Sequence, residues 1–144
     1  MIRAGLLTLL LSTTMNASAW TGCRGEQVDP ATTLLPCTER PNCVSTDHPD
    51  PERRLPLADD VALAQLRAAI LSEPRSDIVA EGPHWLIAHF RSRVFGFVDE
   101  AHFIFRADGR LAMRSGACSG YYDFGVNRRR LERLLAKARQ NAED

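Results

Sequence analysis

Two groups of polar residues in this chain of 144 residues have types and spacing suited to chemistry. Asp99 and Arg114 belong to consecutive predicted strands. The segment that follows adds an acid, an amide and two further guanidinium groups: Asp123, Asn127, Arg128 and Arg130. Guanidinium groups offer planar, paired donors to a carboxylate or a phosphate. These six residues are therefore candidates for binding an anionic ligand.

The turn between the two strands predicts how Asp99 and Arg114 face each other. Asp108-Gly109 is typical of a two-residue hairpin turn. Continued along the strands, that register places Arg114 opposite Phe103 and Asp99 opposite Cys118, on one face of the sheet. We therefore expect an acid and a guanidinium together at one end of an aromatic face.

Three roles are open for this pair. It can be a partly buried ion pair that fixes the end of the sheet without chemistry. It can be the polar end of a ligand pocket. It can also belong to a hydrolase-like enzyme that uses Asp99 or Asp123 as general base while Arg114 holds the substrate, which requires a carboxylate of raised pKa in a concave site.

Familiar catalytic patterns are missing from the sequence. No serine lies in a nucleophile elbow, no glycine-rich loop precedes a helix, and His84 and His89 are five residues apart, a spacing that points them to opposite faces of a strand. We assign no catalytic residue and expect no metal and no cofactor. Eighteen basic and eighteen acidic side chains cancel, so composition does not favour nucleic acid as a partner.

The N-terminus predicts export. Arg3 precedes the apolar run 4–11, and Ala17-Ser18-Ala19 is a suitable cleavage site, so residues 1–22 are expected to be a signal peptide cut after Ala19 or before Cys23. The second option arises because Gly22-Cys23 is similar to a bacterial lipoprotein processing site. Cys23 would then carry a lipid, the only expected link to a membrane. Residues 23–34 are predicted to be a tether and 35–140 a single domain.

The four cysteines are interpreted in an oxidising compartment, the periplasm or cell envelope. If Cys23 is lipidated, Cys37 and Cys43 can close a short disulfide loop and Cys118 remains as an odd thiol. If Cys23 is free, four cysteines allow three pairings and spacing does not choose among them. A zinc site is the weaker alternative, because no paired histidines lie nearby.

The periodicity of apolar residues predicts an α+β fold. Segment 59–72 has helical spacing and Asp59 or Asp60 as its cap; alternation from residue 78 to about 115 predicts strands, including 97–107 and 110–116. A last helix begins near Asn127. We expect an antiparallel sheet of about four strands, with a helix before and a helix after it, and an extended proline-rich leader that wraps over the domain.

The last helix has an unusual first turn. Arg128, Arg129 and Arg130 lie where the helix dipole favours acids and disfavours cations. We expect other groups to compensate these charges, and Asp123 is near enough in sequence to do so.

Three segments resemble one family. They are Pro41-Asn42-Cys43 with its flanks from Leu35 to Ser45, then Phe97-Val98-Asp99-Glu100, and then Arg114-Ser115 continued through Tyr121-Tyr122-Asp123-Phe124-Gly125-Val126-Asn127 to Arg130. In order and spacing they resemble domain-of-unknown-function family 1499 (DUF1499) from about residue 35 to residue 135. Its bacterial members are often small secreted proteins or lipoproteins, and the family has no established activity.

The resemblance implies which positions carry the family pattern: Cys37, Pro41, Asn42, Cys43, Asp99, Arg114, Ser115, Gly120, Asp123, Gly125, Asn127 and Arg130. The chain departs from the pattern at Gly116-Ala117-Cys118, where Cys118 replaces an arginine.

From these observations we expect an envelope protein that is not an enzyme. It would bind a small anionic or amphipathic ligand, or an envelope protein, at the end of the sheet near Asp99, Arg114 and Asn127. A purely structural envelope protein is the remaining alternative, and it predicts a filled core with no cavity beside Arg114.

Overall fold

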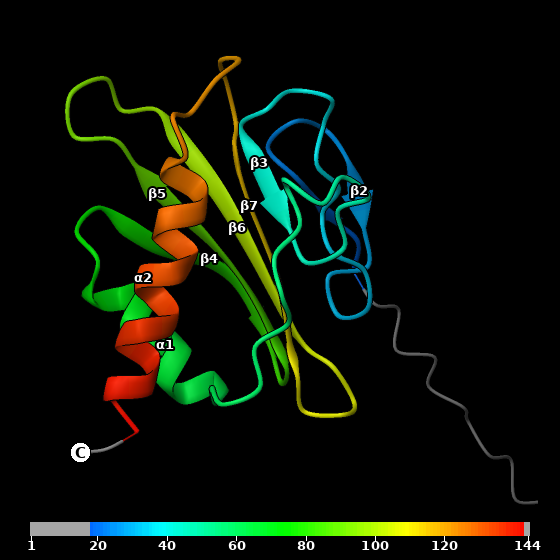
Figure 1. The fold of residues 1–144 in the computed structure, drawn as a ribbon, viewed down its shortest axis with the longest axis vertical. Helices are drawn as coiled ribbons and strands as arrows, with labels where there is room; N and C mark the ends of the chain where they lie inside the picture. The colour runs from blue at the N-terminus through cyan, green and yellow to red at the C-terminus, as the bar shows by residue number, and fades with distance from the viewer. Residues whose placement is uncertain (1–17, 143–144) are drawn as a thin grey trace, which may run out of the picture.

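The computed structural model describes residues 18–142, which form a five-stranded antiparallel sheet, two helices and a separate short hairpin. The elements are β1 (Trp20–Thr21), β2 (Gln27–Val28), β3 (Cys43–Ser45), α1 (Leu63–Ser72), β4 (Ser76–Gly82), β5 (Trp85–Arg91), β6 (Val98–Phe105), β7 (Leu111–Ala117) and α2 (Val126–Gln140). The strand order is β3-β7-β6-β5-β4 (Figure 1). The expected α+β fold is confirmed. The signal-peptide prediction falls largely on residues 1–17, outside the described residues.

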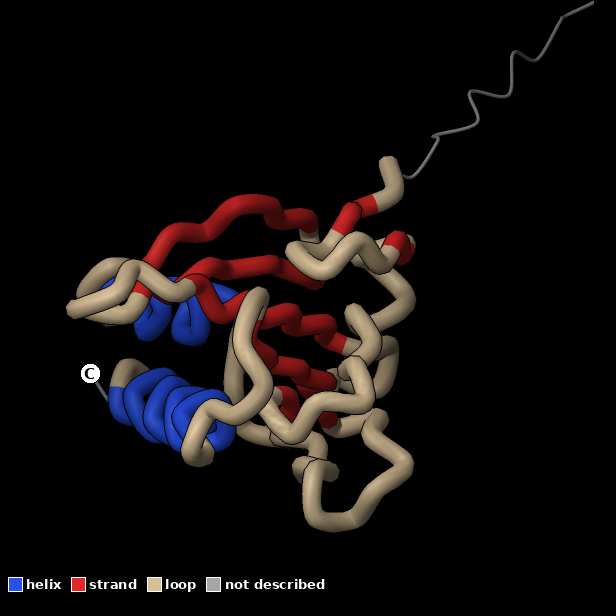
Figure 2. Tube along the Cα trace, turned by 90° about the horizontal axis from the view of Figure 1, so that it is seen from above, coloured by secondary structure: helices blue, strands red, loops and turns tan. Residues whose placement is uncertain are grey.

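Both helices pack on the same face of the sheet (Figure 2). Leu66 and Ile70 of α1 and Leu131 and Leu134 of α2 are fully or almost fully buried. They pack against alternate residues of β5, β6 and β7, whose side chains point toward the helices: Leu86, Ala88, Phe90, Ala101, Phe103, Leu111 and Met113. Burial of each large aliphatic side chain contributes roughly 1.5–3 kcal/mol, so this layer forms the main core. Among the described residues no helix is long and apolar enough to cross a membrane.

The opposite face of the sheet is covered by the N-terminal leader. Leu34 packs on Ile104 and Ala112, and Leu35 is fully buried. The side chain of Arg24 donates to the carbonyl of Ala117 at 2.7 Å. Residues 23–34 are thus fixed to the domain at several points and do not form the free tether that the sequence suggested.

Two disulfides join the leader to the domain. Cys23 is bonded to Cys118 and Cys37 to Cys43, so the predicted short loop is confirmed. A sulfur in a disulfide cannot also carry a lipid thioether, and the structure therefore contradicts a lipid at Cys23. For the same reason Cys118 is not an odd thiol. The four cysteines are all paired, which leaves no thiolate for zinc.

Some element boundaries differ from the prediction. Helix α1 begins at Leu63, after a turn in which the amide of Ala62 donates to the side chain of Gln65 at 3.0 Å. Asp60, expected as a cap, pairs with Arg139 instead. Strand β3 lies inside the proline-rich leader, where no apolar run is long enough to reveal it, and it adds the fifth strand by pairing with β7.

The hairpin between β6 and β7 has a register different from the predicted one. The amide of Arg106 donates to the carbonyl of Arg110, so that Ala107, Asp108 and Gly109 form the turn. Gly109 has φ +83°, the left-handed conformation that a three-residue hairpin loop requires at this position. His102 therefore lies opposite Arg114, and Asp99 lies opposite Ala117. The predicted pairing is wrong by one residue.

We predict that the two disulfides stabilise the fold unequally. The Cys23–Cys118 bridge spans 95 residues and the Cys37–Cys43 bridge spans 6. Loop-closure entropy predicts about 4–5 kcal/mol for the long bridge and about 2 kcal/mol for the short one, as upper values. Urea unfolding of the Cys23→Ser/Cys118→Ser and Cys37→Ser/Cys43→Ser variants measures both losses. A larger loss in the second variant would contradict the prediction.

Candidate functional site

The observed register separates Asp99 and Arg114, which the sequence analysis predicted to lie on one face of the sheet. Side chains alternate between the two faces of a strand, so a slip of one residue moves Asp99 and Arg114 to opposite sides of the sheet. Asp99 turns toward α2, and Arg114 turns toward the leader. Among the described residues no hydrogen bond or ion pair joins Arg114 to Asp99 or Asp123. The predicted site formed by an acid and a guanidinium on one face is therefore wrong.

Arg114 is part of a buried cluster under the leader. Its side chain is 1% exposed, and Nη1 donates to the carbonyl of Glu100 at 2.9 Å. The carboxylates of Glu26 and Glu100 lie 3.7 and 4.0 Å from its guanidinium nitrogens. Burial lowers the pKa of Arg114, while both carboxylates favour its charged form. With no solvent access, this arginine holds the leader on the sheet and does not offer an anion site.

Glu100 and His102 complete this cluster. Burial of Glu100 opposes its ionisation, but hydrogen bonds from His89 and from the Cys23 amide, together with Arg114, outweigh it and hold the pKa of Glu100 below its usual range. His102 accepts from the amide of Leu35 through Nδ1 and lies 2.9 Å from the carbonyl of Pro30 through Nε2. The cluster therefore fixes the leader by polar contacts at several points, which include Cys23, Glu26, Pro30 and Leu35.

On the helix face, Asn127 is the centre of a second network. Its side-chain oxygen accepts from Ser115 at 2.7 Å and from Arg130 at 2.9 Å. Its amide nitrogen donates to Asp123 at 2.8 Å. Arg130 in turn pairs with Asp99 at 2.8 Å and lies 4.7 Å over the ring of Phe90. Six positions of the family pattern thus meet at one end of the sheet: Asn42, Asp99, Ser115, Asp123, Asn127 and Arg130.

Asp123 lies just before the last helix and binds its first amides. Gly125 is the N-cap residue of α2, and the carboxylate of Asp123 accepts from the amides of Gly125 and Asn127 at 3.0 and 3.1 Å. Asn127 therefore lies in the first turn and is not the cap. The expected compensation for the cationic first turn is present only in part, because Arg130 alone has a carboxylate partner, Asp99, among the described residues. Asp123 binds the amides at the start of the helix, where the dipole favours an anion, and pairs with none of the three arginines. Arg128 donates instead to the carbonyl of Glu52 and is directed away from this network.

An open cleft of about 410 Å³ lies above this network. Its sides come from loop 92–97, between β5 and β6, and loop 118–125, between β7 and α2; both lie at the upper end of the molecule in Figure 1. Asp99 and Arg130 line it, and Arg75 and Arg91 add cations. Its aromatic side chains are largely exposed: Phe97 59%, Tyr122 59% and Phe124 78%.

The aromatic loop after β7 is held in a strained conformation. Phe124 has φ +54°, a left-handed conformation that bulky residues rarely adopt. It is preceded and followed by Gly120 and Gly125, both also at positive φ. The ring of Phe124 packs edge-on against Tyr122, with centroids 5.0 Å apart. Residues held in rarely populated backbone conformations cluster at functional sites, and here the residue so held carries an exposed ring.

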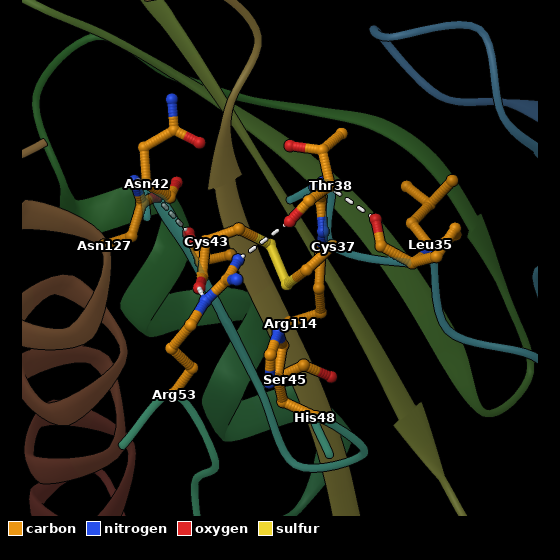
Figure 3. The surroundings of a disulfide bond; sticks show 12 residues. Leu35, Cys37, Thr38, Asn42, Cys43, Ser45, His48, Arg53, Arg114 and Asn127 are labelled. Carbon is orange, nitrogen blue, oxygen red and sulfur yellow. Dashed lines mark hydrogen bonds between the residues drawn. A yellow bond between two sulfur atoms is a disulfide. The ribbon is translucent and has the colours of Figure 1, made fainter. Parts of the chain in front are cut away.

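A larger hollow of about 580 Å³ lies beside the Cys37–Cys43 loop. Figure 3 shows Arg53 reaching across this region, where it donates to the carbonyls of Cys43 and Thr38 at 3.1 and 3.0 Å. The guanidinium is thus used to hold the disulfide loop. The hollow has no exposed aromatic side chain among its lining residues, and we consider the aromatic cleft the better candidate site.

The fold and these motif positions define a small disulfide-bonded α+β domain, and two disulfides indicate an oxidising, extracytoplasmic compartment. The chain belongs to the family described as "Protein of unknown function (DUF1499)", whose model matches residues 33–137. A search of curated proteins found no match.

The structure brings together only part of the predicted site. Asp99 and Arg130 line the cleft with Asp123, and Asn127 supports them from below, whereas Arg114 and Arg128 lie elsewhere. Sequence reasoning missed the aromatic side chains and the cations Arg75 and Arg91. The sequence did contain a signal for the exposed rings of the second loop, because segment 120–127 holds more tyrosine and phenylalanine than a connecting turn requires.

We predict that Asn127→Ala destabilises the fold by about 2–4 kcal/mol. The side chain is fully buried, and its loss leaves Ser115 and Arg130 without their acceptor. Urea unfolding measures the change, with Asn141→Ala at the C-terminal end of α2 as the matched control. A loss below about 0.5 kcal/mol would show that the network has little energetic weight.

We predict an acid-sensitive stability that depends on His102. Burial lowers the pKa of His102 from 6.5 to about 4. The unfolded chain therefore binds more protons between these two values, and stability falls as the pH decreases through that window. His102→Gln keeps a donor and an acceptor but does not titrate. From pH 6.5 to 4.5 the native protein should lose about 2 kcal/mol more than this variant. Equal pH slopes would contradict the assignment.

Proposed function

We propose that the domain is a binding module, without catalytic activity, for a small amphipathic molecule that carries an anionic group. The observation that supports this proposal is the open cleft between loops 92–97 and 118–125. It combines exposed aromatic rings with cationic side chains around a rigid, hydrogen-bonded base. Binding sites of this kind are concave, largely apolar, and have a few placed polar groups.

The aromatic rings of the cleft would contact the apolar part of such a ligand. Phe97 extends from one loop, and Tyr122 and Phe124 extend from the other, so a chain or ring between them would contact both sides of the cleft. Burial of a large aromatic side chain against a ligand contributes more binding free energy than burial of most other side chains. Removing this area from water is the main source of affinity that we expect.

The arginines favour an anionic end. Arg91 lies 3.9 Å from Asp77, and both side chains are more than half exposed, so this ion pair is weak and easily exchanged for a ligand. Arg75 is also exposed and lines the same cleft. Arg130 is already paired with Asp99 and contributes mainly to the rigid base. A carboxylate or phosphate near Arg75 and Arg91 would gain charge-assisted hydrogen bonds.

The two alternatives from the sequence have less support. A hydrolase-like site needs Asp99 or Asp123 beside Arg114, but Arg114 is buried on the other face of the sheet. Asp123 accepts from the amides at the start of α2, and Asp99 accepts from Arg130, so both carboxylates already have partners within the protein. A purely structural protein would not need a cleft edged by exposed rings, one of which, Phe124, is carried on a strained backbone.

For localisation we propose export to the periplasm or cell envelope with cleavage after Ala19. Processing before Cys23 would require a lipid on a sulfur that is bonded to Cys118. Cleavage after Ala19 keeps Trp20–Thr21, which pairs with Gln27–Val28 in the short hairpin.

Calorimetric titration with dodecyl phosphate, below its micellar concentration, tests the proposed function. The native protein should bind it and should bind neutral dodecyl maltoside more weakly. The Phe97→Ala/Tyr122→Ala variant should raise Kd at least about tenfold, since two half-exposed rings are removed. Arg91→Gln should raise Kd about fivefold.

Val79→Ala and Arg139→Gln are the controls, because they change an exposed apolar residue and an exposed arginine outside the cleft. They should leave Kd unchanged. Absence of binding to the native protein, or equal affinity in all variants, would disprove the proposal.

A further inference from the structure

Three apolar side chains at the tips of the two loops are exposed to solvent, and the proposed cleft gives no reason for their exposure. Val94, Phe95 and Tyr121 are 78%, 76% and 68% exposed. None of them lines the cleft. We propose that this end of the molecule docks on the surface of an anionic phospholipid bilayer, with these three side chains inserted at the level of the headgroups. The inference goes beyond the proposed function and uses different residues.

The exposure of these side chains favours an interaction surface. They belong to the two loops that also carry the cleft aromatics, and both loops lie at the same end of the molecule (Figure 1), so exposed apolar side chains gather at this end. Phe95 contacts the ring of Phe97 with centroids 5.6 Å apart, but no other aromatic ring covers it among the described residues. Exposed apolar side chains gathered at one place mark protein or membrane contacts, and aromatic rings prefer the boundary between lipid and water.

The charges around the tips match an anionic surface. Arg91 and Arg93 lie in or beside loop 92–97, and Arg75 is next to them in the cleft wall. Around the other loop, Arg24 and Arg40 donate to the carbonyl of Gly120. Arg129 donates to the carbonyl of Phe124. The whole chain has zero net charge, so this concentration of cations is local.

The acids in the two loops and at the base of the cleft are already engaged. Asp123 is the only acid in the two loops, and it accepts from three donors at the start of α2. Asp99 is paired with Arg130. Each cation near an anionic bilayer contributes attraction that falls within a Debye length, so clustering at the docking end is what such a surface requires.

Both loops are closed by hydrogen bonds before any docking. In loop 92–97 the amide of Ser92 donates to the carbonyl of Phe97 at 2.8 Å, and the amide of Phe97 donates to the Ser92 hydroxyl at 2.9 Å. Loop 118–125 is held by Asp123 and by the contacts of Gly120. Preformed loops lose little conformational freedom on binding. Protruding tips fit a deformable lipid layer, whereas a protein partner would need matching hollows.

Sedimentation with vesicles tests this inference. The native protein should pellet with vesicles of phosphatidylglycerol and phosphatidylcholine, should release as salt is raised, and should not pellet with pure phosphatidylcholine. The variant Val94→Ser/Phe95→Ser/Tyr121→Ser should partition at least about a hundredfold less, because it removes three inserted apolar groups. All three positions are exposed, so the fold should be retained.

A second variant tests the charges. Arg93→Gln/Arg129→Gln should lower partitioning about tenfold or more, whereas Arg133→Gln/Arg139→Gln, farther along α2, should not. The tip and charge variants change no residue that lines the cleft and should keep most of their affinity for dodecyl phosphate. Vesicle binding without dodecyl phosphate binding would support this inference while disproving the proposed function.

Three results would overturn the docking surface. They are native protein that stays in the supernatant with anionic vesicles, tip variants that bind as well as the native protein, and equal binding to neutral vesicles. A native dimer in sedimentation velocity that the tip variant dissolves, without vesicle binding, would also overturn it and assign the tips to a second copy of the chain.

Discussion

The two-residue alternation along β6 and β7 is the constraint on which the rest of the structure depends. It sends Glu100, His102 and Arg114 to one face of the sheet and Asp99 and Ser115 to the other. One strand pair therefore carries two polar networks that do not mix. The network under the leader holds the N-terminal segment in place. The network under the helices positions α2 and provides the base of the aromatic cleft.

The general fold could be predicted from the sequence because its signals are local. Alternation in 85–91 and 98–105, helical spacing in the two helices, and the Cys37–Cys43 spacing each depend on neighbouring residues. The short loop disulfide and the covering role of the proline-rich leader followed from the same local reasoning.

The candidate site could be predicted only in part, because it depends on one turn. Asp108-Gly109 fits two hairpin types, and Gly109 adopts the left-handed position of the longer one. That single added residue reverses the side of Arg114 relative to Asp99. The long Cys23–Cys118 pairing was also beyond local reasoning, since 95 residues separate its ends. The lipid prediction at Cys23 is wrong for this reason.

The long disulfide has a consequence for biogenesis. A chain that crosses a membrane from its N-terminus exposes Cys23 to the oxidising side together with Cys37 and Cys43, long before Cys118 arrives. Thiolates pair with the partners that are within reach, so an early bond from Cys23 to either neighbour must later be exchanged. Correct maturation of this small protein thus favours a compartment that contains a disulfide isomerase as well as an oxidant.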